Sequence, residues 1–164
     1  MSLLARVVYA SMLGRDRRRA KAAARRRKAG ESVAPAADAH LETGRRGEAL
    51  AYWYLRRQGY TVVAQNLRLR PDTGELDLVG WDGPVLAFVE VKTRTSVDAG
   101  LPAEAVSGAQ RQRIAKAAAV YVGRLKPKEV NYRFDIISVV WDRDEGYQLS
   151  LIKDAFRPAG ALKH

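Results

Sequence analysis

The stretch GELDLVGWDGPVLAFVEVKTR, residues 74–94, limits the fold more than any other part of the sequence. Its two halves alternate polar and apolar residues as strands do, and the WDGP segment between them is typical of a turn. We therefore expect two antiparallel strands joined by a hairpin. Glu90 and Lys92 share one face of the second strand with Phe88, because side chains two residues apart point to the same side.

The register of this hairpin decides whether two acids meet. If the turn is centred close to Gly83, Asp77 lies opposite either Val89 or Glu90. In the second register the carboxylates of Asp77 and Glu90 lie within roughly 5 Å of each other. Such a pair repels, which raises the pKa of one acid, and it favours a hard divalent cation such as Mg²⁺ or Mn²⁺. Lys92, one pleat further along, would then place its ammonium group beside the same cluster.

The remaining elements predict an α/β domain. We expect one helix over residues 44–58, with Thr43 as its N-cap and Gly59 at its end, and a second helix over about residues 104–125. Further strands are predicted at YTVVAQ, NLRLR, YRFDIISVVW and YQLSLI. This order predicts a mixed central β-sheet flanked by α-helices.

The first of these helices carries a third acid. Gly47, Ala51, Tyr54 and Leu55 fall on one packed stripe, and Glu48 lies at the edge of that stripe. Glu48 is therefore expected to complete the shell of a metal ion bound by the hairpin acids, or to hold the waters of that ion.

Basic residues dominate the front of the chain. The formal net charge of the 164 residues is +11, and residues 1–40 contain ten Lys or Arg against three Asp or Glu. This balance suggests a polyanionic partner, either nucleic acid or an anionic membrane surface. The Ala/Arg mixture at residues 15–28 predicts either a helix that contacts phosphates or a disordered tail. The folded domain is expected over residues 41–158, after a linker at 30–40 and before a short tail at 159–164.

Several function classes are excluded by what the sequence lacks. There is no cysteine, so disulfides, thiolate catalysis and thiolate zinc sites are ruled out, and this fits a cytoplasmic protein. No window approaches the roughly 18 apolar residues of a membrane span, and the first residues lack the pattern of a signal peptide. His40 and His164 fall in segments expected to be flexible, so we do not expect a histidine general base.

The hairpin acids suit metal-assisted hydrolysis of a phosphodiester. Asp77 and Glu90 would bind the cation, with the backbone carbonyl of Val91 as a further ligand. Lys92 would orient or deprotonate the attacking water, or stabilise the charge of the transition state. Taken alone, the same pattern also fits a charged outer face of a sheet.

Other polar residues are candidates for nucleic-acid contacts. In the second helix Gln110 could touch the phosphate backbone or lie on a solvated face. Glu75 could support the acid pair from its own strand or end a turn, and Asp135 is expected to bond a helix end or an arginine. The predicted phosphate-binding arginines are Arg45, Arg46, Arg94, Arg111 and Arg113.

The sequence resembles the YraN family of small bacterial proteins from about Gly44 to Phe156. The resemblance rests on the motifs GRRGEALAYWYLRRQGY, NLRLRPDTGELDLVGWDG, LAFVEVKTR, AVSGAQRQRIAKAAAVYV, RFDIISV and LIKDAF. That family belongs to the restriction-endonuclease-like PD-(D/E)xK superfamily and is similar to archaeal Holliday-junction resolvases. The resemblance implies a mixed sheet flanked by helices and a nuclease site at Glu48, Asp77, Glu90 and Lys92. The basic residues 1–40 lie outside the family pattern.

Two function classes follow from these observations. The first is a Mg²⁺- or Mn²⁺-dependent endonuclease acting on branched or damaged DNA. The second is a non-catalytic nucleic-acid-binding protein that keeps the endonuclease-like fold and contacts phosphates with its basic residues. Resolvase-like activity would call for a two-fold homodimer, which no residue in the sequence demonstrates.

Overall fold

The computed structural model describes residues 3–30, 39–94, 106–125, 129–142 and 146–157. Five strands form one sheet, in which neighbours in space are also neighbours in the chain. The strands are β1 (Thr61–Leu67), β2 (Leu76–Asp82), β3 (Val85–Arg94), β4 (Tyr132–Asp142) and β5 (Gly146–Ile152). Strands β3 and β4 pair in parallel, whereas the other neighbouring pairs are antiparallel. The predicted α/β fold with a mixed sheet is confirmed.

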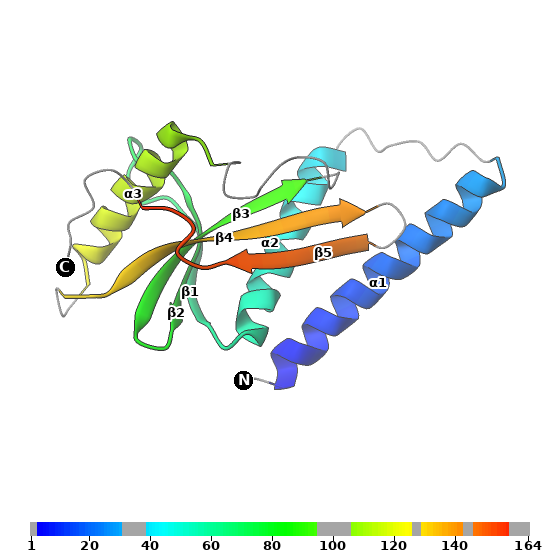
Figure 1. Ribbon diagram of the computed structural model, residues 1–164, viewed down its shortest axis with the longest axis horizontal. Coiled ribbons are helices and arrows are strands. Elements are labelled where there is room, and N and C mark those ends of the chain that lie inside the picture. Colours follow the sequence, from blue (N-terminus) through cyan, green and yellow to red (C-terminus); the bar gives the residue numbers. More distant parts are fainter. Residues whose placement is uncertain (1–2, 31–38, 95–105, 126–128, 143–145, 158–164) are drawn as a thin grey trace.

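The helices cover both faces of the sheet (Figure 1). Helices α1 (Leu3–Lys28) and α2 (Ala39–Arg57) pack on one face, where Leu50, Leu55 and Val89 belong to one buried cluster. Helix α3 (Gly108–Val122) packs on the other face, where Phe88 and Ile114 belong to a second cluster. Successive residues of β3 therefore face different helices, and Glu90 and Lys92 lie on the α3 side with Phe88.

Two helix starts differ from the sequence prediction. Helix α2 begins at Ala39, so Thr43 lies inside it and is not its N-cap; no Gly or Pro between residues 39 and 43 interrupts an upstream extension. Helix α3 begins at Gly108 and is capped by Ser107, whose side-chain oxygen accepts a hydrogen bond from the Gln110 N–H at 3.2 Å. Residues 104 and 105 lie outside the described part of the chain. The predicted end of α2 at Gly59 is confirmed, with a φ of 98°.

The basic N-terminal part of the chain forms a packed helix, α1. Ala5, Tyr9, Met12, Asp16 and Ala20 are buried, and their spacing of three or four residues defines one stripe along α1. The stripe lies against α2 and β5. Residues 3–28 are therefore helical and packed on the sheet domain, which agrees with the helical alternative for residues 15–28. Of the predicted linker, residues 31–38 lie outside the described segments.

Among the described helices, none combines the length and the hydropathy that crossing a bilayer requires.

Candidate active site

The hairpin of β2 and β3 adopts the register in which its acids meet. Leu78 pairs with Val89, and the same register continues along the hairpin. Extended by one residue, it places Asp77 opposite Glu90. The backbone N–H of Val91 donates to the Asp77 carboxylate (Oδ2) at 2.7 Å, which fixes this acid against β3. Of the two registers that the sequence allows, the structure has the one that brings the carboxylates together.

Lys92 and Glu90 form a close ion pair on the α3 side of β3. The Lys92 ammonium (Nζ) lies 2.9 Å from Glu90 Oε1. The Glu90 side chain is 7% exposed, so this pair is largely removed from solvent. Salt screens the attraction within such a pair less than that within a pair on the surface.

Gln110 joins the same two side chains from the first turn of α3. Its Nε2 donates to Glu90 Oε1 at 2.6 Å, and its Oε1 accepts from Lys92 Nζ at 3.1 Å. From the sequence, Gln110 was expected either to contact a phosphate or to lie on a solvated helix face, and neither prediction included these two hydrogen bonds. A signal was present, because Ser107 and Gln110 form the S-x-x-Q pattern of a helix start, which fixes where the first turn of α3 lies.

Asp77 is held in an environment that disfavours its charge. Burial raises the pKa of Asp77 to about 7, with a further contribution from the Glu90 carboxylate and a smaller one from Glu48, while the Val91 N–H and Lys92 act in the opposite direction. The nearby positive charge is therefore insufficient to compensate the acids. Strongly shifted pKa values cluster at functional sites, which makes Asp77 a candidate functional residue.

Glu48 contributes its charge to this site from the opposite face of the sheet. It lies on α2, and its Oε2 accepts a hydrogen bond from Asn66 Nδ2 at 3.3 Å. Among the residues that the structure describes, no group of three or more His, Cys, Asp or Glu side chains could hold a metal ion. The structure thus brings together two acids and a lysine, and it does not bring Glu48 into a shared three-acid group.

Gly47, the residue before Glu48, allows α2 to approach β3 closely. A Cβ at Gly47 would overlap Thr93 Oγ1, so a larger residue here would displace either the helix or the strand end. The sequence analysis assigned Gly47 to the packed stripe, and this position confirms that assignment. The close approach holds Glu48 near enough to raise the pKa of Asp77.

A cavity of about 360 Å³ lies beside the acid pair. Asp77, Glu90 and Gln110 line one part of it, and Arg68 and Arg113 bring positive charge to its wall. The cavity lies between the 71–75 segment and α3; a Cβ at Gly74 would come within 3.0 Å of Arg113 Cβ. Arg68 was not among the predicted phosphate contacts. Glu75, which was weighed as a supporting acid, lines the same cavity.

The predicted phosphate-binding arginines have different surroundings. Arg113 is exposed and lines the cavity, and Arg45 is exposed on α2. Arg46 instead forms an ion pair with Asp16 of α1, with Nη2 3.0 Å from Oδ2. The Arg111 Nε donates to the Val106 carbonyl at 2.9 Å, and its guanidinium lies over the Phe156 ring. Arg94 is partly buried and has contacts of its own. For Arg46 and Arg111 the structure therefore provides a structural role.

Comparison with known proteins places this site within a bacterial family. The model of a family described as "Uncharacterised protein family UPF0102" matches residues 47–139. The chain belongs to this family. The matched segment contains all four predicted nuclease residues and Gln110, whereas α1 precedes it.

Three UPF0102 relatives show how far the similarity extends. The protein of Koribacter versatilis (strain Ellin345) is 43% identical over 121 residues, which are 74% of this chain and 83% of the relative. That of Solibacter usitatus (strain Ellin6076) is 56% identical over 97 residues, 59% of this chain and 74% of the relative. That of Symbiobacterium thermophilum is 42% identical over 113 residues, 69% of this chain and 94% of the relative.

Proposed function

We propose that this UPF0102 protein is a metal-dependent DNA endonuclease that hydrolyses phosphodiester bonds. The observation that carries the proposal is the hairpin register, which sets Asp77 against Glu90 and leaves Lys92 beside them at 2.9 Å from Glu90 Oε1. The resemblance to the PD-(D/E)xK nucleases, stated from the sequence motifs, points to the same residues.

The donor set fits a hard divalent cation. Mg²⁺ in proteins is commonly bound by one or two carboxylates and keeps several waters, so Asp77 and Glu90 are sufficient for such an ion. Asp77 and Glu90 would hold the ion, with the Val91 carbonyl as a further ligand. When bound, the ion would supply charge neutralisation at the scissile phosphate and a more acidic water. The raised pKa of Asp77 supports this assignment, because an added cation would favour its ionised form.

The protein's own residues position the substrate. The Lys92 ammonium, held between Glu90 and Gln110, can donate to a water or to a phosphate oxygen as charge develops there. Arg68 and Arg113 line the adjoining cavity and would hold neighbouring phosphates. The branched or damaged DNA expected as substrate rests on the resemblance to Holliday-junction resolvases.

A cleavage panel tests the proposal. Single-stranded, duplex, flap and four-way DNA are incubated with Mg²⁺ or Mn²⁺ and with wild type, Lys92→Ala, Asp77→Asn or Lys116→Ala. The last variant is the matched control, since Lys116 is an exposed lysine on α3. We expect both site variants to cut at least about 100-fold more slowly while their DNA affinity changes little. The nuclease proposal would be overturned if the site variants cut at the wild-type rate, or if no substrate were cut in a metal-dependent way.

The second candidate is a nucleic-acid-binding protein without catalysis. The net charge of +11 favours it, because basic surfaces bind phosphates without further chemistry. A pure binder gains nothing, however, from buried carboxylates that face the phosphates. In the same panel this candidate predicts DNA binding by every variant and cleavage by none.

A further inference from the structure

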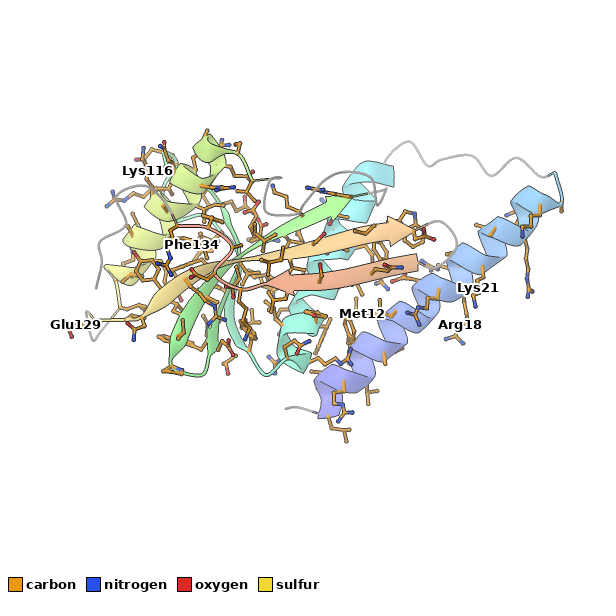
Figure 2. All side chains as sticks on the ribbon, viewed as in Figure 1. Met12, Arg18, Lys21, Lys116, Glu129 and Phe134 are labelled. Atoms are coloured by element: carbon orange, nitrogen blue, oxygen red, sulfur yellow. The ribbon has the colours of Figure 1, made fainter. Side chains whose placement is uncertain are left out.

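The outward side of α1 carries four exposed cations, which we call the basic ridge: Arg18, Lys21, Arg25 and Lys28. Their spacing of three or four residues keeps them on one side of the helix. At about 1.5 Å of rise per residue the ridge is roughly 15 Å long. Figure 2 shows Arg18 extending away from the sheet, whereas Met12 on the same helix points towards it.

The opposite side of α1 fixes the ridge to the domain. The rings of Tyr9 and Tyr54 pack edge to face, with their centroids 5.7 Å apart. Met12 belongs to the buried cluster under α2. Near the middle of α1, the first residue of β5 approaches so closely that a Cβ at Gly146 would lie 3.2 Å from the Arg17 backbone N. The cations are thus presented on a packed helix, so binding would not have to order a flexible tail.

No acid on α1 neutralises the ridge. Asp16 is the only Asp or Glu between Leu3 and Gly30. It is buried and accepts hydrogen bonds from the Arg46 guanidinium, with Nη2 and Nε at 3.0 and 3.2 Å from its Oδ2. Its charge is therefore neutralised within the α1–α2 contact, so no acid of α1 itself offsets the four cations of the ridge.

We propose that the basic ridge binds the phosphate backbone of a nucleic acid, at a surface separate from the acid pair. Charge complementarity and the fixed spacing of the cations support this partner. A helix lying in a membrane interface would need an apolar face along its length. The large exposed apolar side chains of α1 are instead confined to its first turns, at Leu3, Leu4 and Val7. The ridge also precedes residues 47–139, so it adds a surface that the UPF0102 family model does not cover.

A salt titration of DNA binding tests the ridge. The affinity for a short duplex is measured in EDTA, so that no cleavage occurs, from about 50 to 200 mM salt. The ridge variant is Lys21→Gln with Arg25→Gln; the matched control is Lys116→Gln with Arg124→Gln, an exposed pair on or beside α3. Glutamine keeps helix propensity. A quadruple variant that also carries Arg18→Gln and Lys28→Gln enlarges the effect.

Each lost phosphate contact should reduce the slope of log affinity against log salt by about 0.9. We expect reductions of about 2 for the pair and about 4 for the quadruple variant, with the control unchanged. Equal losses in control and ridge variants would mean that only net charge matters, and unchanged slopes would remove the ridge as a binding surface. Binding to phosphatidylserine vesicles that the ridge variants lose while DNA binding persists would show a membrane surface instead. Because the assay excludes cleavage, failure of the nuclease proposal leaves this result untouched.

Discussion

Two aspartates of the sheet, one on each face, are surrounded very differently. Asp135 on β4 is 0% exposed and receives hydrogen bonds from Arg133 Nε, the Tyr60 hydroxyl and the Asp154 N–H. Within the described segments Asp77 on β2 receives one hydrogen bond, from the Val91 N–H, and it has two acids near it. The first is compensated by the fold, whereas the second is compensated only in part.

The difference separates a carboxylate whose charge the fold satisfies from one whose charge the fold satisfies only in part. A buried charge stabilises a fold only when its partners are complete. Asp135 meets this condition, and Arg133 extends its network to Asp82 at 2.6 Å. Asp77 does not meet it, so the folded state retains a penalty that a cation or a proton can relieve. On this account the two residues should respond in opposite directions to the loss of their charge.

The largest effect is expected at Asp135. Asp135→Ala leaves Arg133 and the Tyr60 hydroxyl without their buried acceptor, so the free energy of unfolding should fall by about 3–5 kcal/mol. Urea unfolding at neutral pH measures it. Asp77→Asn serves as the comparison and should not lower stability. Equal destabilisation by both substitutions would abolish the distinction between the two aspartates.

The next effect is a pH dependence due to Asp77. The pKa of this acid rises from 3.8 in the unfolded chain to about 7 in the folded protein. Between these values the folded state binds more protons, so stability falls as the pH rises from about 4 to 7 and is constant above. Between about pH 5 and 8, the free energy of unfolding of the wild type should fall by roughly 2–3 kcal/mol relative to that of Asp77→Asn. If the free energy of unfolding changed with pH in the same way in both proteins, the pKa of Asp77 would not be raised in the folded state.

A smaller effect is expected at Gln110. Gln110→Ala removes one of the two partners of Lys92 but leaves the Glu90 ion pair. The kcat of the proposed DNA cleavage should therefore fall by roughly tenfold, with KM nearly constant. Gln112→Ala, an exposed glutamine on the same helix, is the control. An equal loss in both variants would indicate a general effect on α3 and not a role in positioning Lys92.

The smallest effect is expected at Glu48. Its charge is the weaker of the two acidic influences on Asp77, so Glu48→Gln should lower the pKa of Asp77 by less than about one unit. Glu90→Gln should lower it by more. A reversed order would make Glu48 the stronger acidic influence on Asp77 and would contradict this ranking.

Local patterns predicted the sheet and the acid pair but not the relations between helices. Strand alternation and the turn at Gly83 restricted Asp77 to two positions opposite β3, and long-range packing selected one of them. Glu48 was placed on the correct helix, yet the sequence does not tell which face of the sheet that helix covers. The role of Arg46 escaped prediction for the same reason, because its partner Asp16 lies 30 residues earlier on a helix that was treated as separate.

The central claim is that Asp77 lacks sufficient positive charge and gains it from a divalent cation. NMR titration of the Asp77 side-chain carboxyl carbon, with and without Mg²⁺, tests this claim without depending on activity. We predict a midpoint at about pH 7 without the ion, and a clearly lower midpoint in its presence. A midpoint near 3.8, the ordinary value of this carboxyl, that Mg²⁺ does not change would contradict the account.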